Sequence, residues 1–147
     1  MNKVYACWEN QFEIGLTPEE MYPIANVVTT NFNATVGIEK WFAAGSGFQE
    51  AYATTCAYDF TLTAKRTNGD KGNDLLASFF EGRLGEDAYA YIRVNYPSGL
   101  KITCKYVVTT KEIGISGEMS KVGGLESSCT SSGAPTFDTS EVEDENE

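Results

Sequence analysis

A strand pattern over residues 56–65, running directly into a helix pattern, constrains the fold of this 147-residue chain more than any other feature. Alternate residues of the strand fall on two faces: Cys56, Tyr58, Phe60, Leu62 and Ala64 on one, and Ala57, Asp59, Thr61, Thr63 and Lys65 on the other. A period of two with one apolar face is typical of a sheet that has a core on one side and water on the other. The chain is therefore expected to fold around a β-sheet.

The helix pattern begins just after this strand. Gly69 is expected to supply the turn and Asp70 to cap the helix, with Asp74 one turn further on. Apolar residues then recur at helical spacing: Leu75, Leu76, Phe79 and Phe80. The two aspartates, with Asp59 near in sequence, could formally serve carboxylate catalysis. Helix capping and the helix dipole explain them without it, and no second acidic cluster or phosphate-binding loop supports a catalytic role.

Further strands are expected along the rest of the chain. Alternation predicts strands over residues 24–37, 88–96, 102–109, 113–119 and 125–131. Pro97 and Gly99 predict a tight turn that joins two of them in a hairpin. The predicted fold is mainly β, an antiparallel sandwich or partly open barrel with one short helix at its edge.

Three regions are expected. Residues 1–23 form an N-terminal arm, in which apolar even-numbered residues suggest a strand and Thr17 to Glu20 the start of a helical turn. Residues 24–138 form the β domain. Residues 139–147 form an acidic tail, which is expected to be disordered because its last seven residues carry five of the 21 acids and no base.

Composition excludes several classes of function. The net charge of −10 argues against a nucleic-acid-binding surface, which needs clustered Lys and Arg, although acidic charge also simply confers solubility. The absence of histidine removes the commonest general base and metal ligand. The cysteines are too widely spaced for a zinc set, and Cys56 and Cys104 fall in core phase on their strands. No catalytic, cofactor or metal site is predicted.

The chain is expected to be made and folded in a reducing cytoplasm. No apolar run reaches the ~20 residues of a membrane span, and the first eight residues lack the apolar segment of a secretory signal.

Residues 38–55 are expected to form a long connection rich in large aromatic side chains, namely Trp41, Phe42, Phe48 and Tyr52. Connections run over the surface of a protein, so these rings need cover. The rings could be covered in two ways. The rings could fold back onto their own domain, or a neighbouring subunit could cover them.

The central motif, taken with its flanking segments, resembles a known family. A strand bounded by aromatic residues ends in Lys65-Arg66, and Gly69-Asp70 and then Asn73-Asp74 open the helix. Other segments follow in the same order: Trp41 with the small residues 43–47, the Pro-x-Gly hairpin 96–102, and the closing strand 132–137. Over about residues 36–138 the chain resembles the tail tube proteins of long-tailed bacteriophages. It departs from them at Ala64, where the family has Gly, and in a late Gly-rich turn that is split between Gly114, Gly117 and Gly123-Gly124.

This resemblance implies a structural subunit of a phage tail, found in the virion tail after assembly in the host cytoplasm. Family members form hexameric rings that stack into a hollow tube around a tape-measure protein, between distal tail and tail terminator proteins, with no membrane. DNA passes through without specific binding. The aromatic segment, with Trp41 and Phe42 as anchors, would lie between stacked rings. Polar strand residues would line the lumen: Asn31, Asn33, Asp59, Thr61, Thr63, Glu126 and Ser128.

Two other interpretations stay open. A soluble β-sandwich binding module would use residues 38–55 to hold a partner. An enzyme, such as a small barrel with carboxylate catalysis, has no positive support in the sequence.

Overall fold

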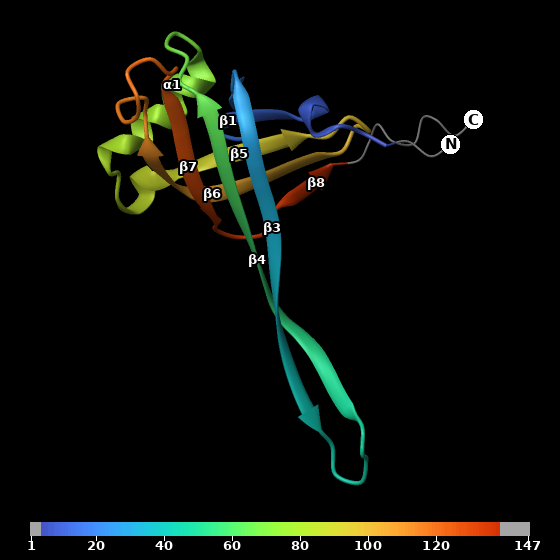
Figure 1. The fold of residues 1–147 in the computed structure, drawn as a ribbon. Helices are drawn as coiled ribbons and strands as arrows, with labels where there is room; N and C mark the ends of the chain where they lie inside the picture. Colours follow the sequence, from blue (N-terminus) through green and yellow to red (C-terminus); the bar gives the residue numbers. More distant parts are fainter. Residues whose placement is uncertain (1–3, 139–147) are drawn as a thin grey trace, which may run out of the picture.

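The computed structural model describes residues 4–138, which form one antiparallel sheet and a short helix (Figure 1). The strands are β1 (Gln11–Thr17), β2 (Glu20–Pro23), β3 (Val27–Phe42), β4 (Gln49–Lys65), β5 (Tyr89–Asn95), β6 (Lys101–Glu112), β7 (Gly124–Ser131) and β8 (Thr136–Asp138). The helix α1 (Lys71–Ser78) follows β4, and the 3-10 turns are η1 (Cys7–Glu9), η2 (Phe79–Glu81) and η3 (Gly85–Ala88).

The sheet curls into a partly open barrel. Its strands follow the order β2-β1-β5-β6-β7-β4-β3, with β8 paired to β6 beside this path. Three strands separate β1 from β4 in this order, yet the ring of Phe12 on β1 lies 5.8 Å from the ring of Phe60 on β4. The two halves of the sheet therefore close over a common core and leave β2 and β3 as edges. The predicted fold class is confirmed.

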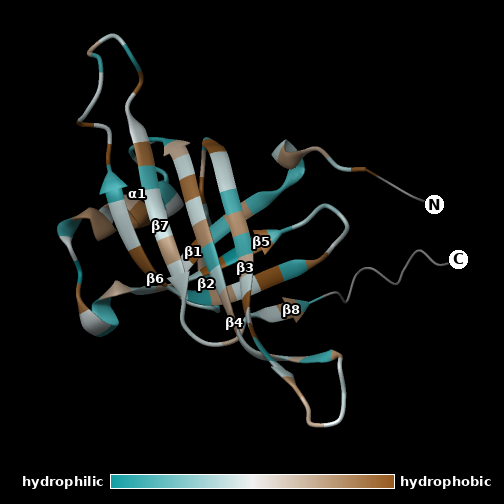
Figure 2. Ribbon diagram, turned by 60° about the horizontal axis from the view of Figure 1, so that its bottom comes forward, coloured by the Kyte–Doolittle hydropathy of each residue, from teal (hydrophilic) through white to brown (hydrophobic). Residues whose placement is uncertain are grey.

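One face of each central strand packs in the core. Apolar and polar residues alternate along these strands (Figure 2), and the buried side chains include Phe60, Leu62, Ala64, Ile92, Cys104, Tyr106, Val108, Leu125 and Cys129. The prediction of a buried Cys104 is confirmed. Burial raises the pKa of the Cys129 thiol to about 12, which keeps it protonated and unreactive at neutral pH.

Side-chain hydrogen bonds fix the start of α1 against the sheet. The Asp70 carboxylate caps the helix by accepting from the backbone N–H of Asn73 at 3.0 Å, and it also accepts from the N–H of Ala25 at 3.1 Å. Asp74 lies in the first turn and accepts from Arg66 Nη1 at 2.9 Å. These bonds join α1 to the end of β4 and to the segment before β3. The face of α1 that carries Leu76 is buried on the core.

The N-terminal segment is part of the sheet. β1 pairs with β5 from Gln11 to Gly15, so the strand suggested by the even-numbered apolar residues has its partner there. The helical turn predicted at Thr17 to Glu20 is wrong, because these residues form the tight turn between β1 and β2, with Thr17 opposite Glu20.

Three sequence predictions are corrected by the structure. The connection expected over residues 38–55 is mostly strand, because β3 and β4 continue to Phe42 and from Gln49. Cys56 is exposed and not in the core, since it lies where this hairpin has left the barrel. The strand expected at residues 113–119 is a loop, because Gly114 and Gly117 adopt left-handed φ angles of 95° and 122°.

Candidate assembly surfaces

The most prominent surface feature is the outer half of the β3–β4 hairpin, which projects far from the barrel (Figure 1). β4 pairs with β7 only between Asp59 and Lys65, so the part of β4 from residue 49 to 58 pairs with β3 alone. Residues 49–57 of β4 are all exposed. An isolated two-stranded hairpin is marginally stable in water, and this one exposes both of its faces.

The aromatic side chains of this hairpin do not share one face. A bulge between Gly37 and Ile38 shifts the register of the two strands. Beyond it, Trp41 lies opposite Glu50, and Tyr52 lies opposite Glu39, which places both rings on one face among carboxylates. Phe42 falls on the other face, and Phe48 lies in the turn at the tip. The four rings therefore give contact surface on both sides of the hairpin and at its end.

These side chains are exposed to solvent. The exposed fraction of the residue is 44% for Trp41 and 80% for Phe48, and the values for Phe42 and Tyr52 lie between these. The rings do not fold back onto the barrel. Within the described residues, this excludes the possibility that the rings are covered by their own domain. Exposed clusters of large apolar residues mark interaction surfaces.

The seven polar residues proposed for a lumen lie together on one sheet face. The register places them in rows across β3, β4 and β7: Asn33 with Asp59, Asn31 with Thr61 and Ser128, and Thr63 with Glu126. This face is opposite to the one that carries the core. Lys111 Nζ lies 3.6 Å from a Glu126 carboxylate oxygen, so the face is polar and mixed in charge.

A second exposed apolar surface lies on the β6–β7 loop, residues 113–123, which the sequence predicted in part as strand. Its side chains Ile115, Met119 and Val122 are 68%, 89% and 68% exposed. The sequence signal that could have identified this loop is the spacing of Gly114, Gly117 and Gly123. Glycines that take left-handed backbone angles interrupt a strand.

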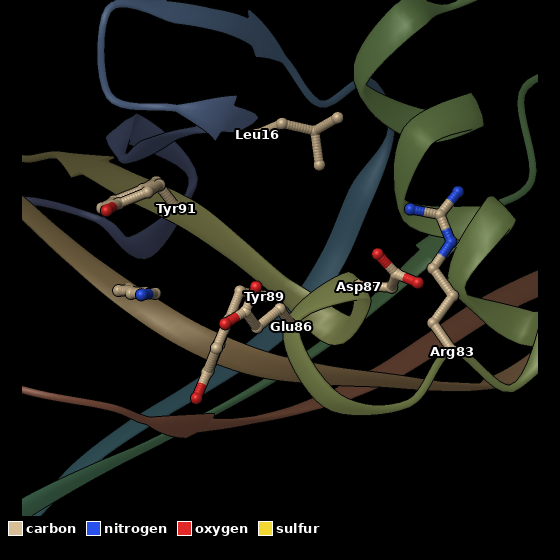
Figure 3. A pocket seen from close by; sticks show the side chains of 7 residues that line it. Leu16, Arg83, Glu86, Asp87, Tyr89 and Tyr91 are labelled. Carbon is tan, nitrogen blue, oxygen red and sulfur yellow. The ribbon is translucent and has the colours of Figure 1, made fainter.

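A hollow of about 540 Å³ lies beside β5 and η3 (Figure 3). Its lining residues are Leu16, Arg83, Glu86, Asp87, Tyr89, Tyr91 and Lys105. Lys105 Nζ lies 4.1 Å from the centre of the Tyr89 ring, a cation–π contact. The hollow mixes both signs of charge, and none of the residues singled out from the sequence lines it.

Residues 4–138 contain no group of three or more acidic or cysteine side chains placed to hold a metal ion. Within the same residues, no helix has the length and apolar character needed to cross a membrane.

Solved structures with the same fold come from phage-like particles. A chain from the C6-symmetric tail of the empty gene transfer agent particle aligns with a TM-score of 0.71 and 15% identity, covering 92% of this chain and 99% of that chain. A chain of the anti-feeding prophage baseplate, 6-fold symmetrised, gives a TM-score of 0.62 at 10% identity over 97% of this chain and 99% of that chain. A chain of the tube terminating cap of the anti-feeding prophage gives 0.63 at 9% identity over 95% and 93%. No protein-family model and no curated protein matches the chain.

The alignments run over nearly the whole of each chain. The likeness is therefore one of the fold as a whole and not of one common motif. The resemblance stated from the sequence is confirmed at the level of the fold: this chain has the fold of components of the gene transfer agent tail and of the anti-feeding prophage.

Proposed function

We propose that this protein is a structural subunit of a phage or phage-like tail tube, with no catalytic activity. Subunits form hexameric rings, and rings stack into a hollow tube around a tape-measure protein. The observation that carries this proposal is the near full-length likeness to a chain of a C6-symmetric tail.

The exposed sheet edge supports assembly of this kind. β3 spans 16 residues, and within the described residues it pairs only with β4. Long unpaired edges are a liability in a monomer because they pair with other chains. A closed ring of subunits uses such an edge in every copy and leaves none unpaired.

The two sides of the sheet support different roles in the tube. The core face and α1 belong to the body of the subunit. The polar face that holds Asn31, Thr61 and Ser128 lines the lumen, where DNA passes without binding. The projecting hairpin, with Trp41 and Phe42 as anchors, contacts the next ring. Tape-measure, distal tail and tail terminator proteins are the expected partners, and the virion tail is the expected location.

Analytical ultracentrifugation of the purified protein over a range of concentrations tests this proposal. Large assemblies that grow with concentration are expected. A binding module that uses the same exposed hairpin would instead sediment as a monomer at every concentration and would gain mass only with its ligand.

A further inference from the structure

We infer that the β6–β7 loop, residues 113–123, is the docking site for the hairpin tip of a second copy of this chain in the next ring. This inference rests on the proposed function and adds the receiving surface, which the alignments do not assign. It is carried by three observations: the loop exposes three large apolar side chains, it is held in shape, and it lies at the opposite end of the same strand from the hairpin tip.

The loop is shaped before any partner arrives. One carboxylate oxygen of Glu112 accepts hydrogen bonds from the backbone N–H groups of Gly114, Ile115 and Ser116 at 2.8 to 2.9 Å. The two ends of the loop are in close contact, since a Cβ on Gly123 would lie 2.8 Å from Gly114 Cα. A preorganised surface loses little conformational entropy when it binds.

The same bonds leave the apolar side chains in solvent. Ile113 packs against the core at the base of the loop, while Ile115, Met119 and Val122 are mostly exposed. A methionine adapts to the shape of its partner and makes favourable contacts with aromatic rings. This chemistry fits the aromatic side chains of the hairpin.

The two surfaces cannot meet within one molecule. The backbone N–H of Arg66, just after β4, donates to the carbonyl of Gly123 at 3.0 Å, which fixes the loop at the end of β4. The hairpin tip lies at the start of β4, 17 residues away, which is roughly 55 Å at the rise of a strand. Figure 1 shows the loop (orange) and the hairpin tip at opposite ends of the molecule.

Unlike surfaces at opposite ends of a molecule produce an open, repeating contact from copy to copy. Aromatic side chains bury ~150–250 Å² each, so Phe48 at the tip together with Trp41 and Tyr52 on one face can supply several hundred Å². This approaches the ~800 Å² that each partner contributes to a standard interface.

Cross-linking between two variants tests the assignment. Both chains carry C7S and C56S, which remove the two exposed thiols. One chain then carries F48C and the other M119C, and the mixture is oxidised after tubes have formed. The expected result is a disulfide-linked dimer of the two chains on a denaturing gel. The matched control pairs F48C with L84C, since Leu84 is 83% exposed but lies on the segment between η2 and η3; this pair is expected to stay uncrosslinked.

A second variant keeps the test independent of F48C. M119D is expected to keep the melting temperature of the unsubstituted subunit, because Met119 is 89% exposed, and to lose tubes. Tubes that form without the F48C–M119C cross-link, or normal tubes from M119D, would overturn this inference and leave the tail tube function standing. An unsubstituted protein that never forms tubes would overturn both.

Discussion

At the scale of single residues, a few buried or shared polar contacts hold the β-sheet, α1 and the β6–β7 loop in one arrangement. The Thr110 hydroxyl on β6 donates to the Leu76 carbonyl of α1 at 2.6 Å and lies 2.9 Å from the Ser127 hydroxyl on β7. Both hydroxyls are buried. A buried hydroxyl that loses its hydrogen-bond partner costs free energy. Each of these contacts therefore favours one position of the two elements that it joins.

Replacing Thr110 with Val is expected to destabilise the subunit by ~1–3 kcal/mol, because Ser127 then stays buried one partner short. For a domain of this size that corresponds to a fall in melting temperature of roughly 3–10 °C. Thermal unfolding followed by circular dichroism measures it. T61V is the control, because Thr61 lies on the exposed polar face. Equal melting temperatures for the two variants would show that the hydroxyl network contributes nothing.

Glu112 is expected to control the order of the β6–β7 loop. Its backbone hydrogen bonds, that from Ser116 above all, hold the pKa of the carboxyl below the usual 4.5. A folded-state pKa below the unfolded value contributes stability that is present above the unfolded pKa and is lost as the pH falls through the folded one. The protection of the Gly114, Ile115 and Ser116 amides from hydrogen exchange, relative to the intrinsic rate at each pH, should therefore be high at neutral pH and be lost below that lowered pKa.

In E112A these three amides should lack protection from hydrogen exchange at every pH, while amides of β6 and β7 that face each other stay protected. Unchanged protection in E112A would mean that the glycine backbone alone shapes the loop.

At the scale of elements, the β3–β4 hairpin combines two parts with different physical roles. The inner part lies in the barrel and places Phe60 and Leu62 in the core. The outer part has no core side, and its aromatic side chains are exposed. Stability of the subunit should therefore depend on the inner part and assembly on the outer one.

Replacing Trp41 with Ala is expected to change the melting temperature of the soluble subunit by less than about 2 °C, because exposed positions contribute within ~0.5 kcal/mol. The same change should abolish or shorten tubes. F60A is the matched core control and should lower the melting temperature by more than ~10 °C, since truncating a buried Phe costs ~3–5 kcal/mol. A destabilised W41A subunit that still makes normal tubes would refute the interface role of this ring.

The sequence predicts those elements whose burial is one-sided. Alternation located the core face of β4 at Phe60, Leu62 and Ala64, and it located β5 and β6, because each has one face in the core and one in water. Alternation could not identify the outer hairpin as strand. Both of its faces are exposed, so its residues do not alternate between a buried and an exposed side.

The strand prediction for residues 113–119 is wrong for a different reason. Apolar residues there alternate like those of a strand, but the Glu112 carboxylate occupies the backbone N–H groups that a strand would need for pairing. A side-chain contact of this kind leaves no periodic trace in the sequence. The candidate lumen residues, in contrast, could be grouped from the sequence because strand register follows from alternation.

At the scale of the whole molecule, the subunit has three surfaces that point in different directions. These are the polar sheet face, the projecting hairpin and the β6–β7 loop. Figure 1 shows the hairpin and this loop at opposite ends of the molecule. A stacked tube would use the ends for axial contacts and keep the polar face for the lumen. On assembly, the polar face should then stay open to small molecules and become closed to large ones.

Cysteine labelling tests this change in a background with C7S and C56S. T61C should react in assembled tubes with a small maleimide but not with a maleimide attached to a large carrier protein, because the lumen excludes the carrier. E81C on η2, on the helix side of the sheet, should react with both. Reaction of T61C with the carrier in intact tubes would show that the polar face is outside.

Electron microscopy of the purified, unsubstituted protein at high concentration tests the central claim most directly. The proposed function predicts hollow tubes built of stacked rings, with six subunits in each ring and the β3–β4 hairpin reaching from one ring to the next. A protein that stays strictly monomeric, even with its tape-measure protein and tail initiator complex present, would contradict the assignment as a tail tube subunit.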